Sequence, residues 1–85
     1  MKNRLYLILK KEPFDAIKNG TKKQEYRDLT DYYKNRLFDK LGNPIKFDSV
    51  LFRNGYSKAA ESFEIEFIST KADKYGYIIN LGKLL

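Results

Sequence analysis

Apolar and polar positions alternate near the start of the chain, over residues 5–9. Leu5, Leu7 and Leu9 share one face of the predicted β-strand, because successive side chains of a strand point to opposite faces. The other face, with Tyr6 and Ile8, is also apolar, so we expect this strand to lie in the middle of its sheet. The same alternation predicts strands at residues 49–53, 62–68 and 77–81, with a shorter candidate at 45–47 and a break at Gly82.

A three-residue spacing of apolar positions replaces this alternation after residue 11 and predicts a short helix over residues 12–20. Phe14 and Ile17 share the face of this helix that packs on the sheet. Pro13 suits the first helical position, where its missing N–H costs nothing. Gly20 suits the left-handed position that ends the helix.

A second short helix follows a capping residue, Thr30 or Asp31, and ends at about Phe38. Tyr33 and Leu37 lie four positions apart and form its apolar face. We expect the two cations of this helix to face solvent. These cations are Lys34 and Arg36.

The elements follow one another as strand, helix, strand, helix and then three or four strands. The 85 residues have room for one domain, residues 1–85, with a modest core. A flat sheet would leave long edges exposed, so we expect an α+β fold whose strands curl into a small half-open barrel covered by two short helices. The predicted core is Leu5, Leu7, Leu9, Phe14, Ile17, Leu37, Val50, Phe52, Phe63, Ile65, Phe67, Ile79 and Leu81.

The composition narrows the possible chemistry. The chain has no cysteine, which excludes disulfides and thiolate nucleophiles. It has no histidine, which is the commonest metal ligand and the commonest general base at neutral pH. We expect no metal and no cofactor, and we expect Glu64 and Glu66 to form a solvated strand face. No targeting segment and no apolar run of ~20 residues is visible, so we expect a cytoplasmic protein without a membrane partner. The sequence does not indicate an oligomeric state.

The positive charge is concentrated in the first half of the chain. Residues 1–40 carry 11 basic and 6 acidic side chains, whereas residues 41–85 carry 6 basic and 5 acidic side chains. A formal net charge of +6 favours an anionic partner such as RNA, DNA or a nucleotide. Ordinary solubility charge on a lysine-rich protein is the alternative.

Residues 20–27, Gly-Thr-Lys-Lys-Gln-Glu-Tyr-Arg, fit the pattern G-x-K-x-x-E-x-R. This pattern resembles the characteristic motif of the ASCH superfamily, which is related to the PUA RNA-binding domain. The segments 7–17, 52–56 and 77–84 also look like parts of small bacterial and phage ASCH proteins, so the resemblance spans nearly the whole chain. It implies a PUA-like β-barrel and, by inference, binding of RNA or a nucleotide.

The polar strand predicted at residues 22–27 supplies the first group of candidate binding residues. Arg27 offers a planar fork to phosphate or to a base edge, and Lys22 offers a point charge. Glu25 can orient either cation or accept from a base amino group. In a regular strand Lys22 faces away from Glu25 and Arg27, so a bulge near Gly20 is needed to join them. The alternative is a structural salt bridge between Glu25 and Arg27.

The second group of candidates surrounds the turn at Asn54 and Gly55. A tight turn in which both adopt positive φ explains these two residues, but not Arg53 and Tyr56. Arginine binds phosphate and tyrosine stacks on a base, so we expect this turn to lie beside residues 20–27 and to complete one cleft. We also expect one of Tyr26, Tyr32 and Tyr33 to face that cleft. The predicted ligand-binding residues are Lys10, Lys22, Glu25, Tyr26, Arg27, Arg53, Asn54 and Tyr56.

A small hydrolase is the main alternative to a binding module. Some ASCH relatives remove an acetyl group from cytidine with a lysine that matches Lys22 and a threonine nucleophile. Glu25 stands in the place of that threonine here, and Thr21 precedes the lysine. If the protein is an enzyme acting on modified nucleosides or RNA, Lys22 and Glu25 are the expected catalytic pair. A protein-interaction role is a third possibility.

Overall fold

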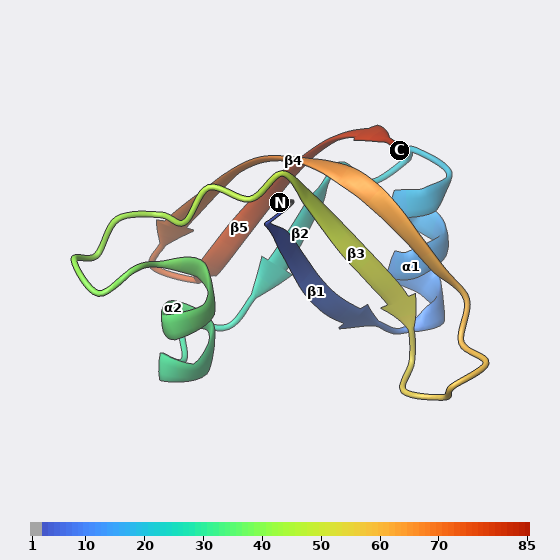
Figure 1. The fold of residues 1–85 in the computed structure, drawn as a ribbon, viewed down its shortest axis with the longest axis horizontal. Helices are drawn as coiled ribbons and strands as arrows, with labels where there is room; N and C mark the ends of the chain where they lie inside the picture. The colour runs from blue at the N-terminus through green and yellow to red at the C-terminus, as the bar shows by residue number, and fades with distance from the viewer. Residues whose placement is uncertain (1–2) are drawn as a thin grey trace.

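The computed structural model describes residues 3–85 and contains one curled five-stranded sheet with two short helices (Figure 1). The expected α+β class and the half-open, barrel-like curl are therefore confirmed. None of the helices described is long and apolar enough to cross a membrane. In chain order the elements are β1 (Arg4–Leu9), α1 (Lys11–Lys18), β2 (Gln24–Arg27), α2 (Asp31–Leu37), β3 (Ser49–Asn54), β4 (Ser62–Asp73) and β5 (Gly76–Leu84).

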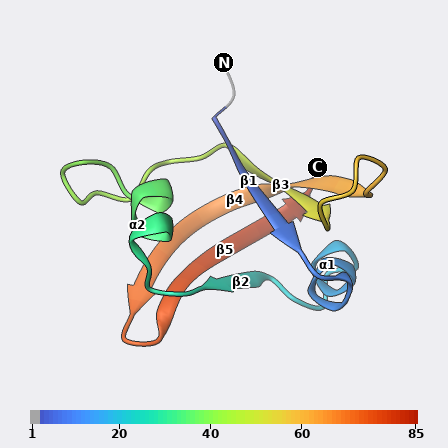
Figure 2. The same ribbon diagram turned by 90° about the horizontal axis from the view of Figure 1, so that it is seen from below.

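The strand order in the sheet is β1-β3-β4-β5-β2, so β1 and β2 form its two edges. β1 and β3 are parallel, and the other neighbours are antiparallel. Register shifts around Phe67 bend β4, and the long β4 and β5 carry the two edges round toward each other (Figure 2). The prediction of a central first strand was wrong: β1 is an edge strand, and Tyr6 on its second face is 53% exposed.

The core lies inside the curl of the sheet. All of the predicted core residues are buried except Phe67, which is partly buried and packs against Phe47 with ring centroids 5.2 Å apart. α1 lies at one end of the curl and α2 at the other (Figure 2). Phe14 of α1 and Leu37 of α2 are fully buried. The two short helices therefore act as covers for the open barrel, as expected.

The two helices differ little from the prediction. α1 begins at Lys11, so Pro13 occupies its third position rather than its first. Proline is tolerated there because the N–H groups of the first turn have no partner within the helix. Gly20 has a φ of +88°, as its predicted capping role requires. Thr30 caps α2, and its Oγ1 accepts a hydrogen bond of 3.2 Å from the backbone N–H of Tyr33.

The strands differ from the prediction mainly at their ends. β4 continues through polar residues to Asp73, a stretch without apolar alternation, and within residues 3–85 the segment 45–47 forms no strand. Gly82 lies inside β5 instead of ending it; a Cβ there would clash with the carboxylate of Glu66. Asn54 is the last residue of β3, and only Gly55 of this pair has a positive φ.

Candidate functional site

Arg27 joins the two edge strands, which are not paired with each other in the sheet. Its Nη2 donates to the carbonyl oxygen of Ile8 on β1 at 3.0 Å and to Oε2 of Glu25 at 2.8 Å. Its Nη1 donates to the hydroxyl of Tyr33 on α2 at 2.9 Å. The Arg27 side chain is only 15% exposed. It therefore ties β1, β2 and α2 together at the open side of the barrel.

The carboxylate of Glu25 is buried between two cations. Arg27 lies on one side of it, and the Nζ of Lys22 lies 3.3 Å from Oε1 on the other. Lys22 precedes β2, so strand alternation does not fix its direction and no bulge is needed to bring the three residues together. A buried carboxylate is costly unless it is paired, so this cluster has a structural role whatever else it does.

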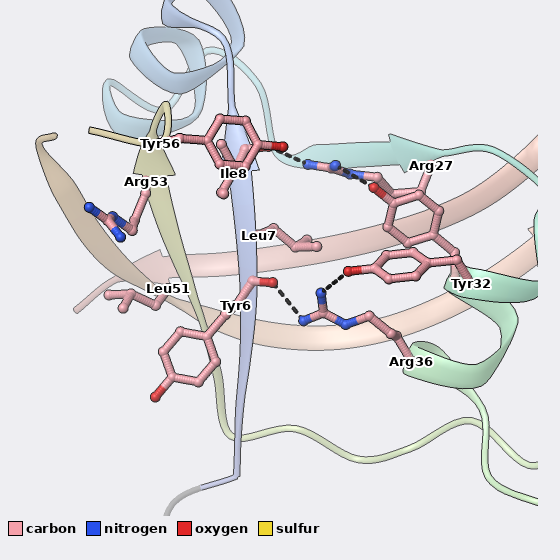
Figure 3. Close-up of a pocket in the computed structure, with 10 residues that line it drawn as sticks. Tyr6, Leu7, Ile8, Arg27, Tyr32, Arg36, Leu51, Arg53 and Tyr56 are labelled. Atoms are coloured by element: carbon pink, nitrogen blue, oxygen red, sulfur yellow. Dashed lines mark hydrogen bonds between the residues drawn. The ribbon is translucent and has the colours of Figure 1, made fainter. Parts of the chain in front are cut away.

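A hollow of about 340 Å³ opens beside the Arg27 bridge, between β1, β3 and α2 (Figure 3). We name it the arginine pocket, because Arg27, Arg36 and Arg53 line it. Within residues 3–85, no aspartate or glutamate belongs to its lining. Four tyrosines and three aliphatic side chains complete its wall, namely Tyr6, Tyr32, Tyr33, Tyr56, Leu7, Ile8 and Leu51.

Arg36 belongs to this pocket although the sequence predicted it on the solvent side of α2. Its Nη2 donates to the carbonyl oxygen of Tyr6 at 2.7 Å, and its Nη1 donates to the hydroxyl of Tyr32 at 2.9 Å (Figure 3). Arg36 bonds to a backbone carbonyl of β1 that no neighbouring strand uses, because β1 is an edge strand. Its spacing of three and four residues from Tyr33 and Tyr32 was a signal that the three share a side of the helix.

The end of β3 and the turn after it supply the other side of the pocket. Arg53 lies next to Ile8 in the sheet register, and its Nη2 donates to the carbonyl oxygen of Ser57 at 2.6 Å. Tyr56 is 86% exposed at the rim. The structure therefore brings Arg27, Arg53 and Tyr56 to one pocket, as the predicted cleft requires. Asn54 is not among the lining residues.

Two further hollows adjoin the arginine pocket. The seam hollow, about 310 Å³, lies between β1 and β2 and gathers the predicted residues Lys10, Glu25 and Tyr26. The hairpin hollow, about 230 Å³, lies beside the β4–β5 hairpin and is lined in part by Tyr26 and Tyr75. Lys22 is not among the lining residues of any of the three hollows, although it contacts Glu25 below them.

The chemistry available at these hollows is that of cations and phenol rings. The structure of residues 3–85 holds no group of three or more carboxylates placed to bind a metal ion. Glu64 bonds to Arg4 and Ser49, so it is not the freely solvated residue that was predicted. The hydroxyl of Thr21 is bonded to Ala16 and Asn19 at the end of α1.

Comparison with protein-family models, curated proteins and solved structures returns no match for this chain. The interpretation of the site therefore depends on its geometry.

Proposed function

We propose that the arginine pocket binds the phosphate and base of a nucleotide, either free or within RNA. The observation that carries the proposal is a pocket lined by three arginines and four tyrosines, and by no carboxylate among the described residues. A nucleotide combines an anion with a flat aromatic ring. Guanidinium groups bind the first, and tyrosine rings stack on the second.

The three arginines have different roles in this proposal. Arg53 donates one hydrogen bond within the protein, and each Nη of Arg36 donates one, so both keep free N–H groups for a phosphate. Arg27 donates three hydrogen bonds to protein groups, its Nε is buried, and its side chain is only 15% exposed, so little of it is open to a ligand. We therefore assign direct ligand contact to Arg36 and Arg53, and a positioning role to Arg27.

The resemblance of residues 20–27 to the ASCH motif supports the same function. We propose that the half-open barrel is a PUA-like ASCH domain and that the protein works in the cytoplasm. Two of the three motif residues, Lys22 and Arg27, both donate hydrogen bonds to the third, Glu25. The ligand contacts of this protein therefore come mainly from α2, from the end of β3 and from the turn after it.

An enzymatic role has weaker support. Lys22 and Glu25 form a close pair, but the hydroxyl of Thr21 is engaged at the end of α1. Hydrolysis of an acetylated nucleoside needs a nucleophile beside such a pair. Mass spectrometry of acetylated cytidine and of short RNAs after incubation with the protein tests this: we expect no product.

Titration of a labelled single-stranded RNA at several salt concentrations tests binding. We expect affinity to fall steeply as salt rises, because released counterions contribute to it. Arg53→Ala should weaken binding by on the order of 1–3 kcal/mol. Lys83→Ala removes an exposed charge outside the pocket and is the matched control. The proposal fails if neither the RNA nor a free nucleotide, AMP, binds, or if the two variants lose affinity equally.

A further inference from the structure

The exposed tyrosines of the chain gather along one path. Two of the seven tyrosines, Tyr33 and Tyr77, pack with the core. The other five are between 53% and 86% exposed, and every one lines the arginine pocket, the seam hollow or the hairpin hollow. They are Tyr6, Tyr26, Tyr32, Tyr56 and Tyr75.

The three hollows are neighbours, because successive hollows share lining residues. The arginine pocket and the seam hollow share Ile8, Arg27 and Tyr33. The seam hollow and the hairpin hollow share Tyr26, Arg27 and Asp28. Arg27 lines all three, so the hollows lie along the bridge between the two edge strands. We name this row of hollows, with its five exposed rings, the tyrosine groove.

A cation lies close to several of these rings. The guanidinium of Arg36 is 5.6 Å from the ring centroid of Tyr32, and the Nζ of Lys22 is 5.9 Å from that of Tyr26. At the hairpin end, the Nζ of Lys74 lies 5.0 Å from the centroid of Tyr75. Three of the five rings therefore have a positive charge close by: Arg36 lines the groove, whereas Lys22 and Lys74 contact its rings without being among its lining residues.

Two of the rings are also held in place by their hydroxyl groups. Tyr26 donates a hydrogen bond of 2.8 Å to Oε1 of Gln24, two residues earlier on the same strand. Tyr32 accepts a hydrogen bond of 2.9 Å from Arg36. A ring that is already fixed loses less conformational entropy when a ligand stacks on it. These tyrosines are therefore suited to stacking.

We propose that the tyrosine groove binds a single-stranded nucleic acid over several nucleotides, with its bases on the rings and its phosphates beside the cations. This inference rests on the proposed function and extends it, because one nucleotide needs only the arginine pocket. A row of rings with cations close to them complements a ligand in which bases and phosphates repeat. A duplex does not fit this description, because its base faces are already stacked on one another.

The two ends of the groove differ in their carboxylates. Asp28 and Asp73 lie at the hairpin hollow, whereas the arginine pocket has no carboxylate among its described lining residues. Asp73 also accepts hydrogen bonds from the backbone N–H groups of Tyr75 and Gly76. We expect phosphates to bind most strongly at the arginine end, and stacking to contribute most at the hairpin end.

The affinity of the protein for adenylates of increasing length, beginning with AMP, tests the groove. The adenylates are prepared as matched RNA and DNA series, and a blunt-ended duplex is measured for comparison. We expect affinity to rise with length and then to level off. Tyr75→Ala should lower the affinity of the long single strand roughly tenfold and leave AMP binding unchanged. Tyr56→Ala should weaken the binding of both AMP and the long single strand. Leu41→Ala, at an exposed apolar residue outside the groove, is the control and should change neither.

The outcomes separate this inference from the function on which it rests. If AMP binds as tightly as the longest strand, the groove is wrong and the nucleotide pocket stands. If the duplex binds as tightly as the single strand, stacking on the tyrosines is wrong. If no adenylate binds, both proposals fail. If one of the two series, RNA or DNA, binds more tightly, the result supports the groove and identifies which nucleic acid it prefers.

Discussion

The guanidinium of Arg27 donates a hydrogen bond of 3.0 Å to the carbonyl oxygen of Ile8, across the gap between the two edge strands of the sheet. Two residues earlier on β1, the carbonyl oxygen of Tyr6 accepts a hydrogen bond of 2.7 Å from Arg36. Open strand edges promote pairing with other chains, and here arginine side chains occupy the carbonyls that an added strand would use. The same two arginines fix one wall of the arginine pocket.

Arg27→Ala should destabilise the fold. Glu25 is 6% exposed, and the substitution leaves its carboxylate with Lys22 alone while it also removes the hydrogen bonds to Ile8 and Tyr33. Removal of one partner from a buried ion pair predicts a loss of about 3 kcal/mol in the free energy of unfolding, measured in urea. Arg27→Lys should recover part of this loss, because it keeps the charge but not the fork.

Arg53→Ala is the matched control for this measurement. Its guanidinium makes one hydrogen bond to a loop carbonyl, so the substitution should change the free energy of unfolding by ~0.5 kcal/mol or less. Equal destabilisation by the two substitutions would contradict the bridging role of Arg27.

Much of this fold follows from local patterns in the sequence. The alternation of Leu5, Leu7 and Leu9, and the spacing of Phe14 and Ile17, identified side chains that are buried in the structure. Such patterns work because one face of a strand or helix must reach the core. They give no information on which strands are neighbours, and this is why β1 was wrongly expected in the middle of the sheet.

The candidate site was harder to predict for the same reason. Arg27 was identified from its motif, but its hydrogen bond to Ile8 depends on two edges meeting after the sheet has curled. Arg36 was expected in solvent because an isolated helix offers it no acceptor. Its partner is a carbonyl on β1, thirty positions earlier in the chain. Arg53 and Tyr56 were easier to identify as candidate site residues, because a tight turn needs neither an arginine nor a tyrosine at these positions.

Phe52→Ala should be among the most destabilising substitutions in the core. Phe52 is fully buried, and its ring lies 5.6 Å from that of Phe63. Truncation leaves a cavity that the surrounding β3 and β4 strands cannot fill, so we expect a loss of roughly 3–5 kcal/mol. Urea denaturation measures it, and a loss below ~1 kcal/mol would contradict the buried position.

Gly76→Ala tests the close approach of β5 to β2. A Cβ at this position would lie 2.6 Å from the backbone carbonyl oxygen of Arg27, so a strand must move. We expect a loss of roughly 1–3 kcal/mol in the free energy of unfolding. Lys74→Ala, in the exposed part of the same hairpin, should be nearly neutral. Equal stability of the two variants would show that β2 and β5 are less closely packed than described.

The salt dependence of RNA binding should separate the arginines that contact phosphate from the one that positions them. Each phosphate contact with a single strand contributes ~0.7 to the slope of log affinity against log salt concentration. Arg36→Ala and Arg53→Ala should therefore each reduce the slope by about that amount. Arg27 should not contribute, because its side chain is only 15% exposed and its charge is paired with the buried carboxylate of Glu25.

A double variant, Glu25→Gln with Arg27→Gln, makes this last comparison possible in a folded protein. It removes the two buried charges together, so neither is left unpaired, and the net charge of the chain is unchanged. Lys22 also loses its carboxylate partner, but its side chain is 33% exposed to solvent. Circular dichroism checks that the variant is folded before binding is measured. We expect a slope equal to that of the unmodified protein, with weaker affinity because the pocket wall has lost its bridge. A slope reduced as much as that of Arg53→Ala would make Arg27 a direct phosphate ligand and would overturn its positioning role.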